Sequence, residues 1–260
     1  MQLTGKIALI TGAGSGIGKA AAQLLAKAGA KIAALGRTEE ELKETVAQIQ
    51  GDQGEAIPLV ADISQPDQMQ KATQQIVDQW GRIDIVFANA GINGVWAPLE
   101  ELAPEEWDKT LDVNLKGTFL TVKYAVPYLK QQGGSIIITS SVNGTRVFSN
   151  SGATAYSCSK AAQVAFTKMV ALELAKHRIR VNVICPGAIE TDINESTERR
   201  DLEHIQEPVE FPEGKIPLTD GKPGTSEQVA QLVLFLASET SSHITGTEMW
   251  IDGGESLLKG

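Results

Sequence analysis

The stretch KIALITGAGSGIG, residues 6–18, decides the fold, because an apolar run over 6–11 passes directly into a glycine-rich turn. An apolar run without alternation is typical of a strand that is buried on both faces of a parallel sheet. Glycines let the following backbone turn tightly and approach a pyrophosphate, which the free N–H groups of a helix N-terminus attract. The stretch therefore predicts a strand, a phosphate-binding turn and a helix.

The glycine-rich turn follows the pattern TGxxxGxG and not GxGxxG, because Lys19 stands where the third glycine of the second pattern would fall. A turn of this kind could also be a tight connection that binds nothing. Its place at the carboxyl end of the first strand, where open α/β sheets bind ligands, favours binding. The candidate cofactor-binding residues of the turn are Gly12, Gly14, Ser15, Gly16, Ile17 and Gly18.

The same alternation of apolar runs and helical periodicity continues along the chain. Strands are predicted over 6–11, 31–35, 56–61, 83–88, 135–140, 180–184 and 247–251, and helices near 16–28, 38–50, 66–80, 104–131, 155–176 and 226–237. This order predicts an α/β fold in which residues 1–260 form a single domain. The domain would be a doubly wound, Rossmann-type parallel sheet of about seven strands with helices on both faces. Helix signals weaken over 188–224, where four prolines gather, and we expect this segment to be a substrate lid.

Composition excludes several classes of protein. Hydrophobic residues make up 42% of the 260 residues and charged residues 21%, which is typical of a folded globular domain. The formal charge of -9 argues against nucleic acid or a membrane surface as partner. Two cysteines, no signal-peptide pattern and no long apolar run predict a cytoplasmic protein. The three histidines lack metal-ligand spacing, so no catalytic metal is expected.

A second motif is YSCSK, in which Tyr156 and Lys160 are four residues apart at the start of an apolar helix. Residues four apart share a helix face, so the ammonium can lie near the phenol. An isolated pair of this kind could be a surface aromatic beside a solvated charge. Ser140 and Ser141 end the preceding strand, however, and their hydroxyls could reach the same crevice beside a bound dinucleotide.

These motifs, in this order, resemble the short-chain dehydrogenase/reductase family over nearly the whole chain. The resemblance implies a catalytic tetrad of Asn114, Ser141, Tyr156 and Lys160. It also implies further cofactor contacts beyond the glycine turn. These are Asp62 with Ile63 at the adenine, the NAG motif Asn89, Ala90 and Gly91, the two catalytic residues Tyr156 and Lys160, and Pro186, Gly187, Ile189 and Thr191 at the nicotinamide.

One spacing departs from that family. Fifteen residues separate Ser141 from Tyr156, whereas thirteen is usual, so unadjusted counting would select Asn143. Ser140 is the alternative. Ser141 is preferred because SSVNG keeps the strand-end pattern of the family, and the loop after it must then bulge outward by two residues.

The resemblance implies hydride transfer between the nicotinamide and a carbonyl carbon, for which the protein supplies the proton and the geometry. Tyr156 would be the acid in reduction and the base in oxidation. Ser141 would hold the substrate oxygen, and Lys160 would bond the nicotinamide ribose and favour the phenolate. Asn114 would anchor a water that links Lys160 to solvent.

Cofactor choice depends on the end of the second predicted strand, where Gly36 and Arg37 replace the acid typical of NAD sites. A guanidinium suits a 2'-phosphate, which favours NADP. NAD remains possible, because Ser15 stands where many NADP-preferring members have a basic residue. The acidic run 39–41 is interpreted as the first turn of a helix, stabilised by the helix dipole.

The substrate is predicted to be a small neutral molecule: an alcohol/ketone pair, a polyol or a sugar. A 3-oxoacyl-thioester reductase is the alternative, although members of that kind usually carry arginines where Gln132 and His177 stand. A cofactor-binding regulator or scaffold is the non-enzyme alternative, which the complete tetrad disfavours. The helix at 155–176 is apolar around most of its circumference and predicts a homo-oligomer. Family resemblance adds a second interface near 247–251 and hence a homotetramer.

Overall fold

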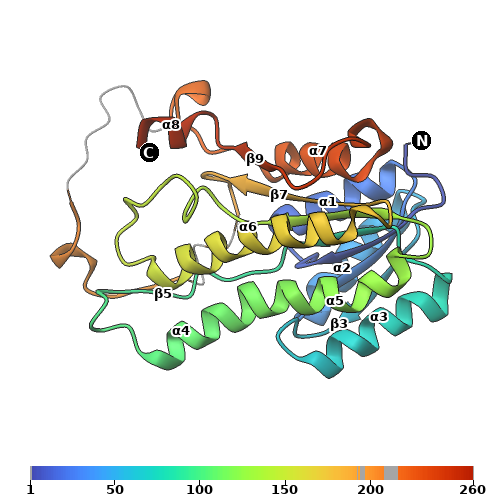
Figure 1. The fold of residues 1–260 in the computed structure, drawn as a ribbon, viewed down its shortest axis with the longest axis horizontal. Coiled ribbons are helices and arrows are strands. Elements are labelled where there is room, and N and C mark those ends of the chain that lie inside the picture. The colour runs from blue at the N-terminus through green and yellow to red at the C-terminus, as the bar shows by residue number, and fades with distance from the viewer. Residues whose placement is uncertain (1, 192, 194–196, 208–215, 260) are drawn as a thin grey trace.

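Seven parallel strands form the central sheet of the computed structural model, which describes residues 2–191, 193, 197–207 and 216–259. Their order is β3-β2-β1-β4-β6-β7-β9. Figure 1 shows the fold, with the helices packed around the sheet. The strands are β1 (Ile7–Thr11), β2 (Lys31–Gly36), β3 (Ala56–Val60), β4 (Ile85–Ala88), β6 (Gly134–Thr139), β7 (Ile179–Pro186) and β9 (Glu248–Ile251). The predicted doubly wound sheet of seven strands is confirmed.

The helices lie close to the predicted ranges. They are α1 (Gly16–Lys27), α2 (Glu39–Gly51), α3 (Pro66–Trp80), α4 (Pro104–Leu111), α5 (Gly117–Leu129), α6 (Thr154–Ala175), α7 (Ser226–Ala237) and α8 (Glu255–Lys259). The expected continuous helix over 104–131 is divided by the π-helical segment η1 (Asp112–Lys116). Such insertions are frequent at functional sites, and Asn114 lies at the centre of this one.

Helices cover both faces of the sheet, and each face has its own apolar core. One core joins the sheet to α3, α5 and α6, and the other joins it to α1, α2 and α7. On β1, Ile7 and Leu9 belong to the first core, and Ala8 and Ile10 to the second. Both faces of the strand are therefore buried, which explains why its sequence is apolar without alternation.

The topology creates a crevice between β1 and β4. The chain runs outward from β1 to β2 and β3, then crosses to β4 on the other side of β1. At such a switch point the connections at the carboxyl ends of the strands diverge, and open α/β sheets bind ligands there. The glycine turn after β1 and the loops after β4 and β6 all reach this edge.

The segment 188–224 is tied down at both ends and in its middle. Ile189 and Gly224 form a parallel bridge, supported by Glu190 N–H donating to the carbonyl of Gly224 at 2.9 Å. In the middle, β8 (Glu198–Arg199) pairs with β5 (Val95–Trp96) in a separate two-stranded sheet. Part of the segment lies outside the described residues. Within the described ranges, no helix has both the length and the apolar character that a membrane span requires.

Candidate active site

A cleft of about 710 Å³ lies at the carboxyl ends of the strands, within the size range of small-molecule and cofactor sites. Eighteen of the twenty predicted site residues line it: Gly12, Gly14, Ser15, Gly16, Ile17, Arg37, Asp62, Ile63, Asn89, Ala90, Gly91, Ser141, Tyr156, Lys160, Pro186, Gly187, Ile189 and Thr191. Gly18 and Asn114 lie behind its wall. The sequence motifs, which are far apart in the chain, are therefore brought to one cavity.

The glycine turn has the geometry of a phosphate cradle. Gly12 and Gly16 have φ angles of 67° and 49°, a conformation that other residues rarely adopt. A Cβ on Gly18 would lie 1.9 Å from the carbonyl oxygen of Gly12, so Gly18 serves the close packing of the turn. The turn leads into the N-terminus of α1, whose free N–H groups favour an anion. These features fit the pyrophosphate of a dinucleotide.

Thr11 and Asn89 hold the neighbouring strand ends together. The Thr11 hydroxyl oxygen accepts hydrogen bonds from the backbone N–H groups of Asn89 and Ala90, at 3.0 and 3.1 Å. The Asn89 side chain donates to the carbonyl of Thr11 and accepts from Thr139. The NAG motif therefore fixes the distance between β1, β4 and β6 at the point where they form the cleft wall.

Ser141, just after β6, and Tyr156 and Lys160 on α6 are the three predicted catalytic groups that come together, and all three are almost completely buried. The hydroxyl of Tyr156 is hydrogen-bonded to that of Ser141. The Lys160 ammonium lies 5.5 Å from the centre of the Tyr156 ring and donates to the carbonyl of Thr139 at 2.9 Å. Phenol, hydroxyl and ammonium thus share one corner of the cleft.

The two adjacent serines differ in what they contact. The Ser140 hydroxyl donates to the carbonyl of Lys160 at 2.7 Å and so joins β6 to α6. The Ser141 oxygen accepts from the N–H of Asn143 at 3.1 Å and partners Tyr156. The geometry therefore places Ser141, and not Ser140, beside the tyrosine, although its catalytic role stays a prediction.

Burial shifts the ionisation of both α6 groups towards their neutral forms. It lowers the pKa of Lys160 to about 8 and raises the pKa of Tyr156, which the hydrogen bond from Ser141 opposes. Removal of a charged group from water disfavours its charged form. Without a ligand, the phenol is therefore held protonated, ready to donate.

Asn114 is fully buried and all its side-chain polar atoms have protein partners. Its Oδ1 accepts from Ile92 N–H, while its Nδ2 donates to Ile92 carbonyl and to Ser159 Oγ. Its own carbonyl accepts from Thr118 Oγ1 at 2.7 Å and from Gln163 Nε2 at 2.9 Å. Ser159 and Gln163, which the sequence did not suggest, thus fix the π-helical segment to α6. The proposed role of Asn114 as a water anchor stays a prediction.

At the opposite end of the cleft, Arg37 and Glu41 both line the wall. Glu41 belongs to the acidic run 39–41, which the sequence predicts to be the first turn of a helix. Glu39 pairs with Lys43 on the surface of α2, as a helix first turn should. Glu41 instead lines the cleft, and its Oε2 lies 2.7 Å from the position that a Cβ on Gly14 would occupy. One member of the acidic run therefore faces the cleft.

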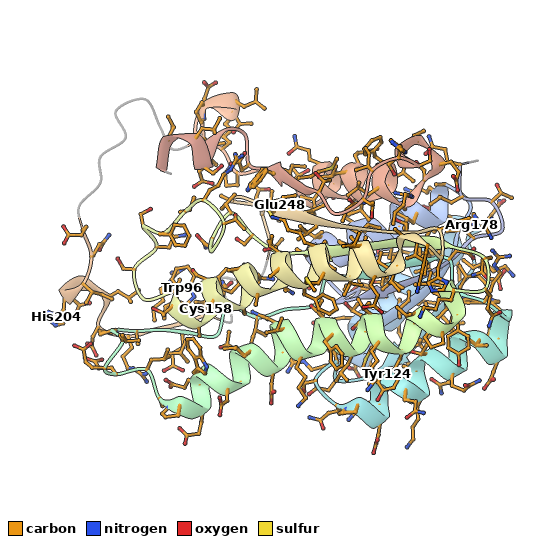
Figure 2. The ribbon with its side chains drawn as sticks, in the orientation of Figure 1. Trp96, Tyr124, Cys158, Arg178, His204 and Glu248 are labelled. Atoms are coloured by element: carbon orange, nitrogen blue, oxygen red, sulfur yellow. The ribbon has the colours of Figure 1, made fainter. Side chains whose placement is uncertain are left out.

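Besides the predicted tetrad members, the catalytic end is lined by residues to which the sequence analysis gave no role at the site. Trp96 was expected in core or interface packing, but its ring centre lies 6.5 Å from that of Tyr156, with the planes inclined at 41°. Figure 2 shows Trp96 beside the first turns of α6. Asn93, Asn143 and Asn150 line the same end. Asn143 follows Ser141 closely in the sequence, whereas Asn93 and Trp96 come to this end from a loop far away in the chain.

Comparison with known proteins finds reductases that match nearly the whole chain. A family model described as enoyl-(acyl carrier protein) reductase matches residues 12–256. The chain is 42% identical over 255 residues to the 3-oxoacyl-[acyl-carrier-protein] reductase FabG of Thermotoga maritima, covering 98% of this chain and 99% of the relative.

Two solved structures superpose on most of the chain. A 3-ketoacyl-ACP reductase from Sinorhizobium meliloti 1021 is 56% identical, with a TM-score of 0.94 and coverage of 97% of this chain and 99% of the other. A 3-ketoacyl-(acyl-carrier-protein) reductase from Brucella melitensis, described as complexed with NADH, is 32% identical, with a TM-score of 0.86 and coverage of 98% and 99%.

The fold, together with these reductase relatives over nearly the whole chain, defines an oxidoreductase. More narrowly, the chain belongs to the short-chain dehydrogenase/reductase family. The predicted family and the prediction of an enzyme are both confirmed, which removes the reason to consider a regulator or scaffold.

Proposed function

We propose that the protein transfers hydride between a nicotinamide cofactor and a neutral ketone or alcohol. The observation that carries this proposal is the convergence of Ser141, Tyr156 and Lys160 in a cleft continuous with the glycine turn. Residues 1–260 act as one domain in this proposal, with 188–224 as the lid. The glycine turn holds the pyrophosphate, Asp62 lies at the adenine end, and Pro186 to Thr191 lie at the nicotinamide end.

The cofactor, when bound, supplies or accepts the hydride. During reduction, Tyr156 donates its proton to the substrate oxygen, which also accepts a hydrogen bond from Ser141. During oxidation the phenol must lose its proton to become a base. With a pKa of about 8, Lys160 is mostly charged at neutral pH, and its ammonium near the Tyr156 ring favours the phenolate.

NADP is the favoured cofactor in this proposal, and NAD is also accepted. Arg37 lines the cleft beside the adenine end and forms no ion pair with the described residues, so its guanidinium is available to a 2'-phosphate. The Glu41 carboxylate on the same wall opposes a phosphate. The NADH bound to the Brucella relative supports a site that tolerates both cofactors.

The catalytic end of the cleft favours a neutral substrate. Of the charged residues that line the cleft, Lys160 and Glu255 lie at this end, and Glu255 Oε2 accepts from Ala188 N–H at 3.1 Å. Other residues at this end are apolar groups or carboxamides, namely Asn93, Trp96, Asn143, Val147, Asn150 and Ile193. An isolated carboxylate would be poorly solvated there. A 3-oxoacyl thioester is the second candidate, supported by the similarity to two reductases of that kind.

A homotetramer in the cytoplasm completes the proposal, with no nucleic-acid or membrane partner. Met169 and Leu172 on α6 are 75% and 83% exposed, which is unusual for large apolar side chains. Among the strands of the described residues, β9 pairs with β7 alone and so forms one edge of the sheet. Both features supply surfaces for a second copy of the chain.

The test is a scan of alcohols, ketones, polyols and 3-oxoacyl thioesters, in both directions and with both cofactors. Wild-type turnover of a neutral ketone is expected. Tyr156→Phe should lower kcat about 10²- to 10⁴-fold, because only the proton donor is lost. Its cofactor dissociation constant, measured by fluorescence titration, should remain close to wild type. Near wild-type kcat in this variant would refute the mechanism.

A further inference from the structure

Asn143 is a buried carboxamide in the cleft wall for which the proposed reaction has no use. It lies in the loop between β6 and α6, two residues beyond Ser141, and is only 8% exposed. Its backbone N–H donates to the oxygen of Ser141 at 3.1 Å. The side chain therefore starts next to the hydroxyl that is proposed to hold the substrate oxygen.

One end of this carboxamide is fixed by the protein. Asn150 Nδ2 donates to Asn143 Oδ1 at 2.8 Å. The spacing between Ser141 and Tyr156, longer than the usual family spacing, supplies the loop that brings Asn150 to this position. With Oδ1 held in this way, the Nδ2 amide of Asn143 points away from Asn150.

The Nδ2 donor of Asn143 has no partner among the described residues, although the residue is more than nine-tenths buried. A buried donor without an acceptor destabilises the folded protein unless a ligand or water meets it. The donor is not sealed in the core, because Asn143 lines the same cleft as Tyr156. The Nδ2 amide of Asn143 is therefore placed to donate a hydrogen bond to an oxygen of a ligand in the cleft.

We propose that Asn143 determines substrate specificity by donating to a second oxygen of the substrate. This inference depends on the proposed reaction. While Ser141 and Tyr156 hold the reacting carbonyl, Asn143 binds a hydroxyl or second carbonyl a few atoms away. The substrate class is therefore an oxygenated neutral ketone, such as a hydroxyketone or a diketone, and not a simple ketone.

Matched substrate pairs, compared by their kcat/KM values, test this inference. The first pair is cyclohexanone and 2-hydroxycyclohexanone. The second pair is pentan-2-one and the corresponding diketone, pentane-2,4-dione (acetylacetone). Wild type is expected to prefer the oxygenated member of at least one pair by about tenfold, the upper range for one neutral hydrogen bond. In Asn143→Leu, which is similar in size, the ratio should fall close to one.

Asn93→Leu is the matched control, because that carboxamide lines the same end but already donates to Thr197 at 2.7 Å. It should leave the substrate ratio as in wild type. Cofactor titration of each variant shows whether it is folded. If Asn143→Leu slows both members of a pair equally, its role is structural and the inference is wrong.

The failures of the two proposals are distinguishable. If wild type reduces ketones without any preference for the oxygenated members, the specificity inference fails while the proposed function stands. If no ketone or alcohol in either pair is turned over, the proposed function fails, and the inference fails with it.

Discussion

At the scale of single residues, neighbouring side chains with the same chemistry have different environments. Ser140 and Ser141 both follow Thr139, the last residue of β6, yet only the Ser141 hydroxyl is hydrogen-bonded to Tyr156. Ser141→Ala should lower kcat severely, because it removes the proposed hydrogen bond to the substrate oxygen. Ser140→Ala should lower kcat much less, since the Ser140 hydroxyl is hydrogen-bonded to the carbonyl of Lys160 and to the Cys185 thiol, and not to Tyr156. The measurement is the steady-state kcat of both variants with the best substrate. If Ser140→Ala lowered kcat more than Ser141→Ala, the hydrogen bond to the substrate oxygen would be assigned to Ser140.

The depressed pKa of Lys160 predicts a pH dependence of stability. Its pKa is about 8 in the folded protein and 10.5 when unfolded, so between these values the unfolded chain binds more protons. The contribution of Lys160 to the free energy of unfolding therefore rises with pH above 8, by up to about 1.4 kcal/mol per pH unit. Below pH 8 the lysine must be charged in a buried place, which destabilises the folded state.

Denaturant unfolding of wild type and Lys160→Met at pH 8 and pH 9 tests this dependence, at one protein concentration. Groups far from Lys160 titrate alike in both proteins, so the difference reports on the lysine and the groups beside it. Wild type should gain stability relative to the variant as the pH rises. Equal changes in both proteins would show that the lysine keeps its ordinary pKa.

Cofactor choice depends on two residues of opposite charge at one end of the cleft. Arg37→Ala should weaken NADP binding by about ten- to a hundredfold, the loss of a charge-assisted hydrogen bond, with little effect on NAD. Glu41→Gln should strengthen NADP binding, because it removes a negative charge near the expected phosphate. Calorimetric dissociation constants for both cofactors check this, and equal affinity of wild type for the two would contradict the NADP preference.

At the scale of secondary structure elements, the sequence predicts the features that residues nearby in the chain determine. It does not predict features that depend on contacts between distant segments. The strands and most helix ends follow from nearby residues, such as Pro66 at the start of α3 and Gly81 at its end. The interruption at Asn114 could not be predicted, because its cause is a set of partners on α6 and at Ile92. The tyrosine and lysine of the proposed site lie four residues apart and could be predicted from the sequence, whereas Trp96 reaches Tyr156 from a distant loop.

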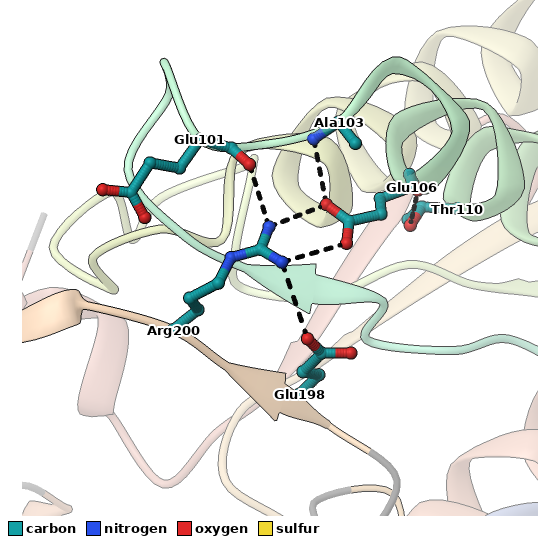
Figure 3. A network of polar contacts seen from close by, with 6 residues as sticks. All are labelled: Glu101, Ala103, Glu106, Thr110, Glu198 and Arg200. Carbon is teal, nitrogen blue, oxygen red and sulfur yellow. Dashed lines mark hydrogen bonds and ion pairs between the residues drawn. The ribbon is translucent and has the colours of Figure 1, made fainter.

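The strand pair of β5 and β8 holds the proposed lid next to the catalytic end. Figure 3 shows the Arg200 guanidinium between the Glu106 carboxylate, the Glu101 carbonyl and Glu198. Both Glu106 oxygens accept from it, at 3.2 and 2.9 Å. Next to it, the Arg199 guanidinium lies 5.4 Å from the centre of the Trp96 ring. These contacts tie a charged part of the lid to α4.

Loss of the Arg200 contacts is expected to weaken the attachment of the proposed lid to α4. The KM for substrate should then rise with little change in kcat. Arg200→Ala should raise KM about two- to fivefold, the range for a partly exposed ion pair. Lys43→Ala, which removes a surface pair with Glu39 on α2, is the control and should leave KM unchanged. A large fall in kcat for Arg200→Ala would indicate that the network orders the catalytic groups themselves.

At the scale of the whole molecule, the residues that stabilise the fold and the residues of the proposed site occupy different parts of the sheet. Two apolar cores on opposite faces fix the strands, while the polar and charged site residues gather at the carboxyl edge. The loops at this edge can vary without disturbing either core, as the longer loop before Tyr156 illustrates. The remaining apolar surface, on α6, is then not explained by the fold of one chain.

That surface carries the last prediction, a homotetramer. α6 packs one side on the sheet through Val164, Ala171 and Leu174, yet leaves Met169 and Leu172 largely exposed on another. A helix that is apolar on more than one side is normally covered on each, and the same helix of a second copy across a two-fold axis would cover it symmetrically. Light scattering should therefore give four times the 27.7 kDa chain mass.

Leu172→Glu would place two like charges at such a two-fold contact and should reduce the assembly to a smaller species. Val60→Glu is the matched control, because Val60 is also exposed and apolar but lies on β3, at the opposite edge of the sheet from β9. It should leave the mass unchanged. A wild-type monomer at micromolar concentration would contradict the oligomer, whereas a stable dimer that Leu172→Glu dissociates would keep the α6 interface and remove only the one at β9.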